Sequence, residues 1–276
     1  MRALPRTLML GAGVGTLVLG LGLWAVIEPA PPPTPIEELL PLPPEPPRLA
    51  DGPEMDRCME LIRSDPETAL AHGRAWEPQD QGDGARHCQA LALLALGEAR
   101  QAAARLEALG RTARAGAVAR AAAFAQATQA WLMDGDANRA VASATLALTL
   151  DPGDAASYTD RALALGLLGR FGDALQDLDA ALQLEPARVE ALVFRAAAKR
   201  RLEQRQAALQ DVSAALALDP DNPEALLERG ILRQLQGDAA GAREDWLRLI
   251  DAAPDSRAAE LAAQNLALSE ASEPVR

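Results

Sequence analysis

Four prolines recur at a fixed interval of 34 residues, at Pro152, Pro186, Pro220 and Pro254. An alanine stands twelve residues before each proline, so the period belongs to a structural unit and not to chance proline placement. These alanines are Ala140, Ala174, Ala208 and Ala242. Self-similarity at such a period is typical of stacked repeat arrays. We therefore predict an all-α chain whose repeating unit is two helices joined by a turn.

The four regularly spaced prolines divide residues 121–256 into equal blocks. With each proline near the end of its unit, the regular repeats are 121–154, 155–188, 189–222 and 223–256. Gly135, Gly169 and Gly237 stand at the same position inside three of these blocks. Glycine there favours the end of a first helix, because it adopts the left-handed backbone conformation that closes helices.

The array continues in weaker form on both sides of the regular repeats. Ala90, Gly97 and Ala102 keep the phase of the repeat upstream, with four extra residues before the first regular block. The expected additional segments are a shortened helical pair at 51–82, a degenerate repeat at 83–120, and a capping helix with its tail at 257–276. Residues 51–276 are thus expected to form one solenoid domain.

The blocks resemble tetratricopeptide repeats, whose pattern has a large residue at position 4 and small residues at positions 8 and 27. Position 4 is Phe124, Tyr158, Leu192 and Leu226. Position 8 is Thr128, Ala162, Ala196 and Gly230. Position 27 is Ala147, Ala181, Ala215 and Leu249. The resemblance implies a right-handed α-α superhelix, a tetratricopeptide-like solenoid that binds proteins and carries out no catalysis.

The resemblance also implies a groove for a partner, lined by fixed positions of each first helix. Carried over to this sequence, the groove residues are Gln129, Leu132, Met133, Thr159, Leu163, Leu167, Val193, Arg200, Arg201, Leu227, Ile231 and Leu235. The expected ligand is an apolar stretch or an amphipathic helix of a client protein. Alternatively, some of these leucines belong to the core between repeats. Lys199 is the only lysine, so the lysine and asparagine set that holds a C-terminal carboxylate in chaperone-binding relatives is absent.

An arginine and an aspartate recur sixteen residues apart in three regular repeats. In the first repeat both are missing together, and Ala127 and Ser143 stand in their places. Joint presence and joint absence predict an ion pair between the two helices of a repeat. The predicted pairs are Arg161 with Asp177, Arg195 with Asp211, and Arg229 with Asp245. A basic ladder for an acidic ligand is the alternative, although each arginine is matched by one carboxylate.

Cys58 and Cys88 are the only cysteines, and they fall in the first helices of two successive units. The apolar N-terminal segment described below predicts that the rest of the chain is exported. Since an exported chain meets an oxidising compartment, we predict a disulfide between the two cysteines. A Cys2His2 metal site that adds His72 and His87 is the alternative. The spacings do not match the paired close spacings of structural zinc sites, so we expect neither metal nor cofactor.

The N-terminus combines two arginines with an almost uninterrupted apolar run from Leu8 to Ile27. About 20 apolar residues suffice to cross a bilayer, and Arg2 and Arg6 favour a cytoplasmic N-terminus. We therefore expect a transmembrane helix in 1–28, with a cleaved secretory signal as the alternative. Segment 29–50 holds ten of the chain's 20 prolines and is expected to be an extended linker.

The composition narrows the possible classes of function. The net charge is −12, whereas a protein that binds nucleic acid usually carries an excess of basic residues, so we do not expect nucleic acid as a partner. The sequence has no Gly-x-Ser-x-Gly, Gly-x-x-x-x-Gly-Lys or His-Glu-x-x-His motif, so we predict no enzyme. We expect a single-pass inner-membrane scaffold that binds a client protein in the periplasm. Alternatives are a self-associating structural envelope protein and an accessory subunit of an assembly machine, such as one for cytochrome maturation.

Overall fold

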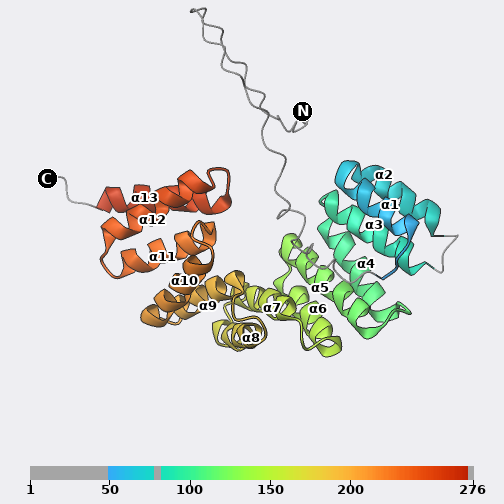
Figure 1. Ribbon diagram of the computed structural model, residues 1–276, viewed down its shortest axis with the longest axis horizontal. Coiled ribbons are helices and arrows are strands. Elements are labelled where there is room, and N and C mark those ends of the chain that lie inside the picture. Colours follow the sequence, from blue (N-terminus) through green and yellow to red (C-terminus); the bar gives the residue numbers. More distant parts are fainter. Residues whose placement is uncertain (1–48, 78–81, 273–276) are drawn as a thin grey trace, which may run out of the picture. The chain divides into compact units, whose positions relative to one another are not determined.

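The computed structural model describes residues 49–77 and 82–272, and all regular secondary structure in these ranges is α-helical (Figure 1). The expected transmembrane helix at 1–28 and nearly all of the expected linker at 29–50 lie outside the described residues. Within the described ranges, no helix is both long enough and apolar enough to cross a bilayer.

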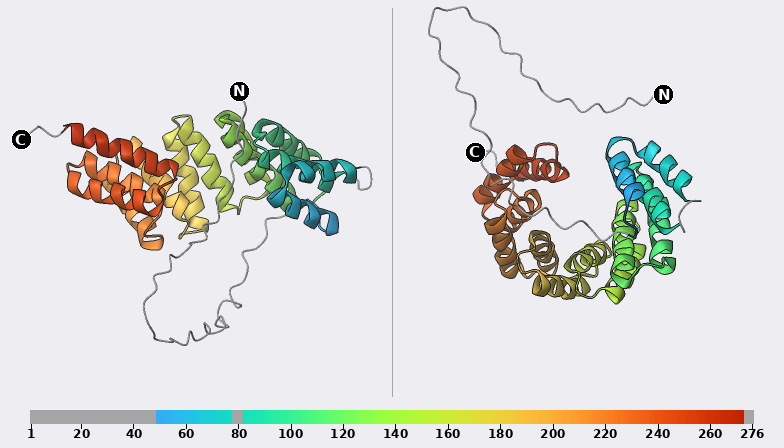
Figure 2. Two further views of the ribbon diagram at one scale, coloured as in Figure 1. Left: turned by 90° about the horizontal axis from the view of Figure 1, so that it is seen from above. Right: turned by 45° about the vertical axis from the view of Figure 1, so that its right-hand side comes forward.

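The described residues form thirteen helices, each of which packs against its neighbours in the chain. The helices are α1 (Pro53–Ser64), α2 (Pro66–Trp76), α3 (Asp83–Ala95), α4 (Ala99–Thr112), α5 (Ala117–Asp134), α6 (Ala137–Leu150), α7 (Ala155–Leu167), α8 (Phe171–Leu184), α9 (Val189–Arg201), α10 (Arg205–Leu218), α11 (Pro223–Leu235), α12 (Ala239–Ala252) and α13 (Arg257–Ser272). From α5 onward, the odd-numbered helices also contact one another in sequence, α5 with α7 and so on to α13. First helices of successive repeats therefore lie side by side, and second helices lie behind them (Figure 2).

The turns inside the repeats follow from glycine at one fixed position. Gly135, Gly169 and Gly237 have backbone φ angles of 82°, 74° and 86°, in the left-handed region that glycine adopts without strain. The repeat over 189–222 has Glu203 at this position, with a φ of 62°. A glutamate is held there in a conformation that costs a residue with a side chain about 1 kcal/mol.

Two boundaries differ from those predicted. Helix α5 begins at Ala117, so the four extra residues before position 121 form its first turn and lengthen it to 18 residues. Leu49, at the end of the predicted linker, is buried against Leu109, Ala113 and Ala123. The folded unit therefore starts before residue 51, because this leucine covers the junction of α4 and α5.

Small residues let the two helices of a repeat approach closely. In the last repeat, a side chain at Gly230 would place its Cβ 2.2 Å from Nε1 of Trp246. Trp246 is buried in the core, and its large ring occupies the space that an alanine would fill at position 230. Glycine and tryptophan are thus complementary partners across α11 and α12.

A disulfide joins Cys58 of α1 to Cys88 of α3, with 6.0 Å between their Cα atoms. Both sulfurs are buried with Met55 and Trp76. Because the sulfurs bond each other, they are not available as ligands of the alternative metal site. The histidine Nε2 atoms contact separate groups, His72 the Glu54 carbonyl at 3.0 Å and His87 the Gln126 side chain at 2.7 Å.

Candidate partner-binding surface

The three repeated arginine and aspartate side chains meet as two-pronged ion pairs. Arg161 donates from Nε and Nη2 to the two carboxylate oxygens of Asp177, both at 2.7 Å. The pair of Arg195 with Asp211 has distances of 2.9 and 2.8 Å, and that of Arg229 with Asp245 has 2.9 and 2.6 Å. The aspartates are 3 to 7% exposed. These charges hold the two helices of a repeat together, which leaves them unavailable to a ligand.

Two of these arginines also reach the preceding repeat, a contact that the sequence analysis missed. Nη1 of Arg161 lies 3.3 Å from Oγ1 of Thr145, and Nη1 of Arg195 lies 2.8 Å from Oδ1 of Asp179. Hydrogen bonds to Asp177 and Asp211 raise the pKa of the respective arginines above its usual range. Each acceptor stands sixteen residues before its arginine. The spacing that predicts the ion pairs, applied upstream of each arginine, would therefore also have predicted these contacts between repeats.

The first regular repeat replaces the ion pair with a carboxylate from the helix before it. Oε1 of Glu107, on α4, accepts hydrogen bonds from Nε1 of Trp131 at 2.8 Å and from Oγ of Ser143 at 2.6 Å. Burial alone would raise the pKa of Glu107, yet these two donors and Arg111 hold it below its ordinary value. Ser143 occupies the aspartate position, so a single acceptor from outside the repeat joins α5 to α6.

The predicted groove residues fall into three groups by exposure. The exposed ones are Gln129, Met133, Leu167, Arg201 and Leu235. The half-buried ones are Leu132, Leu163, Arg200, Leu227 and Ile231, and three of these, Leu132, Leu227 and Ile231, pack against core clusters. Among the apolar groove residues, Met133 and Leu167 are the most open to solvent, with 64% and 63% of their surface exposed. The accessible part of the predicted groove therefore lies toward the ends of the first helices.

Thr159 and Val193 are buried, and their assignment to the groove is wrong. Oγ1 of Thr159 donates to the Ala155 carbonyl at 2.8 Å within its own helix. Val193 belongs to the core cluster that includes Leu226. The physical reason is the contact between neighbouring first helices, which covers this position in the middle of the array.

The basic trio at the end of α9 is mostly neutralised by acidic partners. Nζ of Lys199 lies 2.7 Å from Asp211. Arg200 donates to both oxygens of the buried Glu228 on α11, at 2.5 and 3.1 Å. Arg201 has no carboxylate partner among the residues that the structure describes, and its guanidinium lies 5.0 Å from the ring centre of Phe171. Only Arg201 of this trio therefore presents its charge to a ligand.

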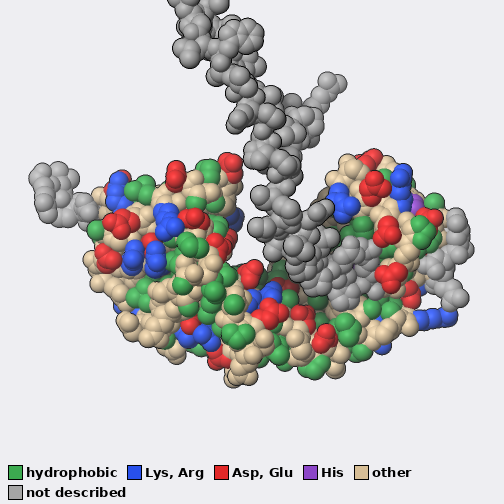
Figure 3. Space-filling view, in the orientation of Figure 1, with side chains coloured by type: hydrophobic (Ala, Val, Ile, Leu, Met, Phe, Trp, Pro, Cys, Tyr) green, Lys and Arg blue, Asp and Glu red, His purple; other side chains and the backbone are tan. Residues whose placement is uncertain are grey.

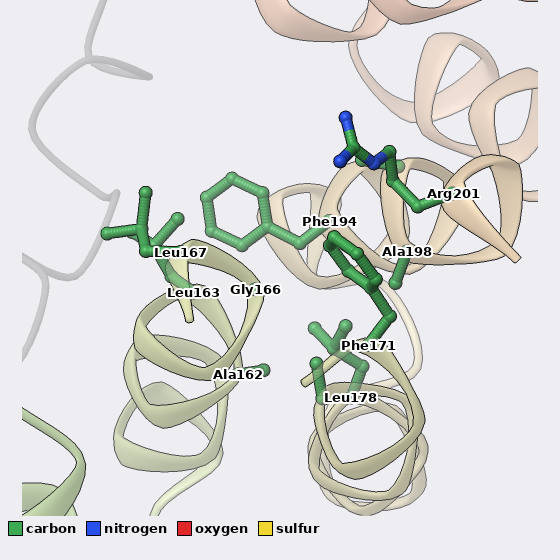
Figure 4. Close-up of a pocket in the computed structure, with 11 residues that line it drawn as sticks. Ala162, Leu163, Gly166, Leu167, Phe171, Leu178, Phe194, Ala198 and Arg201 are labelled. Atoms are coloured by element: carbon green, nitrogen blue, oxygen red, sulfur yellow. The ribbon is translucent and has the colours of Figure 1, made fainter. Parts of the chain in front are cut away.

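Arg201 lies at the rim of an apolar cavity of about 170 Å³ between α7, α8 and α9 (Figure 4). Leu163, Leu167, Phe171 and Phe194 are among its lining side chains, and among the described residues that line it Arg201 is the only charged one. Both leucines lie at predicted groove positions, whereas neither phenylalanine does. The chain has only three phenylalanines, and this scarcity is the one signal that could have marked them.

Gln129 belongs to a second, more polar cavity of about 480 Å³ beside α5, which Asp151 and Asp154 also line. Nε2 of Gln129 donates to Asp160 on α7 at 3.2 Å. Burial raises the pKa of Asp160 above its ordinary value, with smaller contributions from neighbouring carboxylates. This contact ties α5 to α7 and is not an acid and base pair. Acidic and basic side chains are interspersed on the face seen in Figure 3.

The helical array is similar to solved structures of repeat proteins. A tetratricopeptide repeat protein from Parabacteroides merdae superposes with a TM-score of 0.57 at 21% identity, covering 70% of this chain and 75% of that one. A thermophilic TPR protein from Thermus thermophilus superposes with a TM-score of 0.56 at 19% identity, covering 68% and 99%. The described chain has a tetratricopeptide-like fold.

A third structure, the MamA RS-1 ArsTM double mutant, superposes on the tetratricopeptide-like array with a TM-score of 0.51 at 18% identity, covering 74% of this chain and 96% of that one. No protein-family model matches the sequence, and no curated protein matches it. At these identities the structures establish the fold alone. The function has to be argued from the residues of this chain.

Proposed function

We propose that the protein is a non-enzymatic scaffold that binds a client protein on the first-helix side of its tetratricopeptide-like array. The observation that carries this proposal is the open apolar cavity between α7, α8 and α9. The repeated ion pairs are used within the fold, whereas Leu167 and its neighbours expose apolar surface with no described element packed over it. Exposed apolar surface beside a preformed cavity favours protein binding.

The proposal includes a location. The apolar run from Leu8 to Ile27 would anchor the chain in the inner membrane, and the repeat array would lie in the periplasm. The disulfide between Cys58 and Cys88 supports this location, because disulfides persist in oxidising compartments. Tethering raises the effective concentration of the array near other membrane-bound proteins. Cleavage of the N-terminal segment would instead give a free periplasmic protein.

The experiment is a crosslinking pull-down of the full-length protein from its native membrane, in parallel with a Leu167→Glu variant. We expect the variant to lose the captured partners, because a carboxylate at the rim of the apolar cavity is costly to desolvate. Leu218→Glu on α10 is the matched control, since Leu218 is 51% exposed and does not line the cavity. Capture of the same partners by the Leu167→Glu variant would contradict the proposed binding surface.

Self-association is a second candidate, favoured by one observation on the last helix. Leu261 and Leu268 of α13 are exposed on the side of the helix that does not pack against α11 and α12. Two apolar side chains seven residues apart lie on one helix face and could meet a second copy. Concentration-dependent sedimentation that disappears in a Leu268→Glu variant would support self-assembly. A protein that remains monomeric at all concentrations would exclude it.

A further inference from the structure

We propose that the cavity between α7, α8 and α9 binds one bulky apolar side chain of the client, and that Arg201 binds a carboxylate beside that side chain in the client sequence. This inference rests on the proposed protein-binding function and names the chemistry of the partner. The recognised element is thus a short acidic segment that carries an aromatic or large aliphatic residue.

The size and lining of the cavity fit a single side chain. Its volume is about 170 Å³, and its described lining is apolar except for Arg201. An apolar cavity of about 150 Å³ is known to bind benzene in another protein. Two phenylalanine rings, Phe171 from α8 and Phe194 from α9, line the cavity and can pack against an entering aromatic or aliphatic side chain (Figure 4).

Glycine at position 166 keeps the cavity accessible. Gly166 lies inside α7, where glycine costs roughly 1 kcal/mol relative to alanine. Its backbone is not left-handed, and a Cβ added to it would meet no atom within 4 Å. Neither backbone strain nor close packing therefore requires glycine at this position. The absence of a side chain at Gly166 leaves open space beside the cavity wall.

Arg201 supplies the charge that selects the neighbouring residue of the client. Lys199 and Arg200 are neutralised by Asp211 and Glu228, so Arg201 carries the unpaired positive charge of this trio. The cation–π contact with Phe171, 5.0 Å from the guanidinium carbon to the ring centre, helps to orient the planar guanidinium, whose N–H donors lie along its edges. A carboxylate can accept two parallel hydrogen bonds from such an edge, the strongest arrangement for this pair of groups.

The charge of the rest of the chain strengthens the selection. With a net charge of −12, the protein as a whole repels an acidic segment. Attraction at Arg201 then fixes where and in which direction such a segment docks, because electrostatic complementarity governs orientation more than affinity. A basic segment would gain nothing at this cavity.

The first test identifies the client segment directly. A photoreactive amino acid replaces Leu167 in the full-length chain, and crosslinked peptides from the native membrane are sequenced by mass spectrometry. We expect client segments with a bulky apolar residue within two positions of an aspartate or glutamate. Crosslinks to neutral or basic segments would overturn the inference while leaving protein binding intact. Absence of any protein crosslink, here and at Met133, would instead contradict the proposed function.

The second test separates the cavity from the stability of the fold. Gly166→Leu should fill the opening and lower client capture at least tenfold with no loss of melting temperature, since its Cβ meets nothing. Gly172→Leu is the matched control, because Gly172 is also a helical glycine with open space but does not line the cavity. Undiminished capture by a folded Gly166→Leu variant would overturn the assignment of the cavity.

The third test addresses the charge and does not depend on the cavity variant folding. Arg201→Glu should lower capture at least tenfold, and changing the acidic residue of the client segment to lysine should restore it. Arg205→Glu, at an exposed arginine outside the cavity lining, should have little effect. Equal capture by the Arg201→Glu and wild-type proteins, or no restoration by the charge swap, would overturn the role of Arg201.

Discussion

The first regular repeat and the three that follow it connect their two helices through different polar groups. In the later repeats, an arginine on the first helix and an aspartate on the second form an ion pair. In the first repeat, Glu107 from the preceding unit accepts hydrogen bonds from Trp131 and Ser143 instead. The comparison teaches that each of these repeats has a buried or largely buried carboxylate, with its hydrogen bonds satisfied, between its two helices, whichever helix provides it.

The two arrangements differ in what remains when one member is removed. Loss of an aspartate strands a partly buried cation, whereas loss of Glu107 strands two neutral donors. An uncompensated charge costs more than an unsatisfied hydroxyl or indole. The later repeats should therefore be the more sensitive to single substitutions at this position.

The largest effect is expected for Asp245→Ala in the last regular repeat. Asp245 is buried and contacts both Arg229 and Arg233, so its removal should lower the free energy of unfolding by about 3–5 kcal/mol. Chemical denaturation measures this loss. Asp221→Ala is the matched control, because the exposed pair of Asp221 with Arg248 should contribute no more than about 1 kcal/mol. Equal losses in the two variants would remove the distinction between buried and surface pairs.

A smaller loss is expected for Glu107→Ala in the first repeat. The substitution leaves Trp131 and Ser143 without their acceptor, which should cost about 1–3 kcal/mol. Denaturation of the single variant and of Glu107→Ala with Ser143→Ala would show whether the serine donor carries part of this cost. A loss as large as that of Asp245→Ala would break the proposed ranking of the two arrangements.

The pH dependence of the first repeat should follow the titration of Glu107. Because its pKa in the folded state is lowered from the ordinary value of 4.5, its contribution is present above that pH and is lost as the pH falls through the folded value. The difference in stability between wild type and Glu107→Gln should thus shrink in acid. Melting temperatures of both proteins between neutral pH and acidic pH measure it. A constant difference would contradict the assigned pKa direction.

The smallest effect is expected at the turn where the repeats themselves differ. Glu203→Gly places glycine at the left-handed position that three other repeats already fill with it, and should raise the free energy of unfolding by about 0.5–1 kcal/mol. Thermal melting of the variant measures the gain. Gly169→Glu is the reverse substitution and should lower stability by a similar amount. A loss on Glu203→Gly would indicate that the glutamate side chain contributes more than its backbone strain costs.

Much of the array could be predicted from sequence because its determinants are periodic. Fixed spacing identifies the helices, their turns and the partners Arg195 and Asp211, since repeated units place equivalent residues in equivalent contacts. The prediction of groove residues from their positions in the repeat was less successful. Thr159 and Val193 occupy the same position and are buried, because neighbouring first helices contact each other there.

The cavity itself could not be predicted, because it depends on departures from the repeat. Phe171 and Phe194 have no aromatic counterparts at the same positions of the next repeat, which are Arg205 and Glu228. A prediction based on what the repeats have in common does not identify residues that occur in one repeat alone. The proposed binding surface of this array therefore lies where one repeat differs from its neighbours, while the core lies where all repeats agree.

The reach of Arg195 across two repeats has a consequence for how the array unfolds. Its guanidinium holds Asp211 of its own repeat and Asp179 of the preceding one, so one side chain is shared by two units. In a linear array, cooperativity depends on such nearest-neighbour terms. Amide hydrogens of α8 and α10 should consequently exchange in one concerted opening, whereas those of α6, which Arg161 reaches only through the longer contact with the uncharged Thr145, should open more independently.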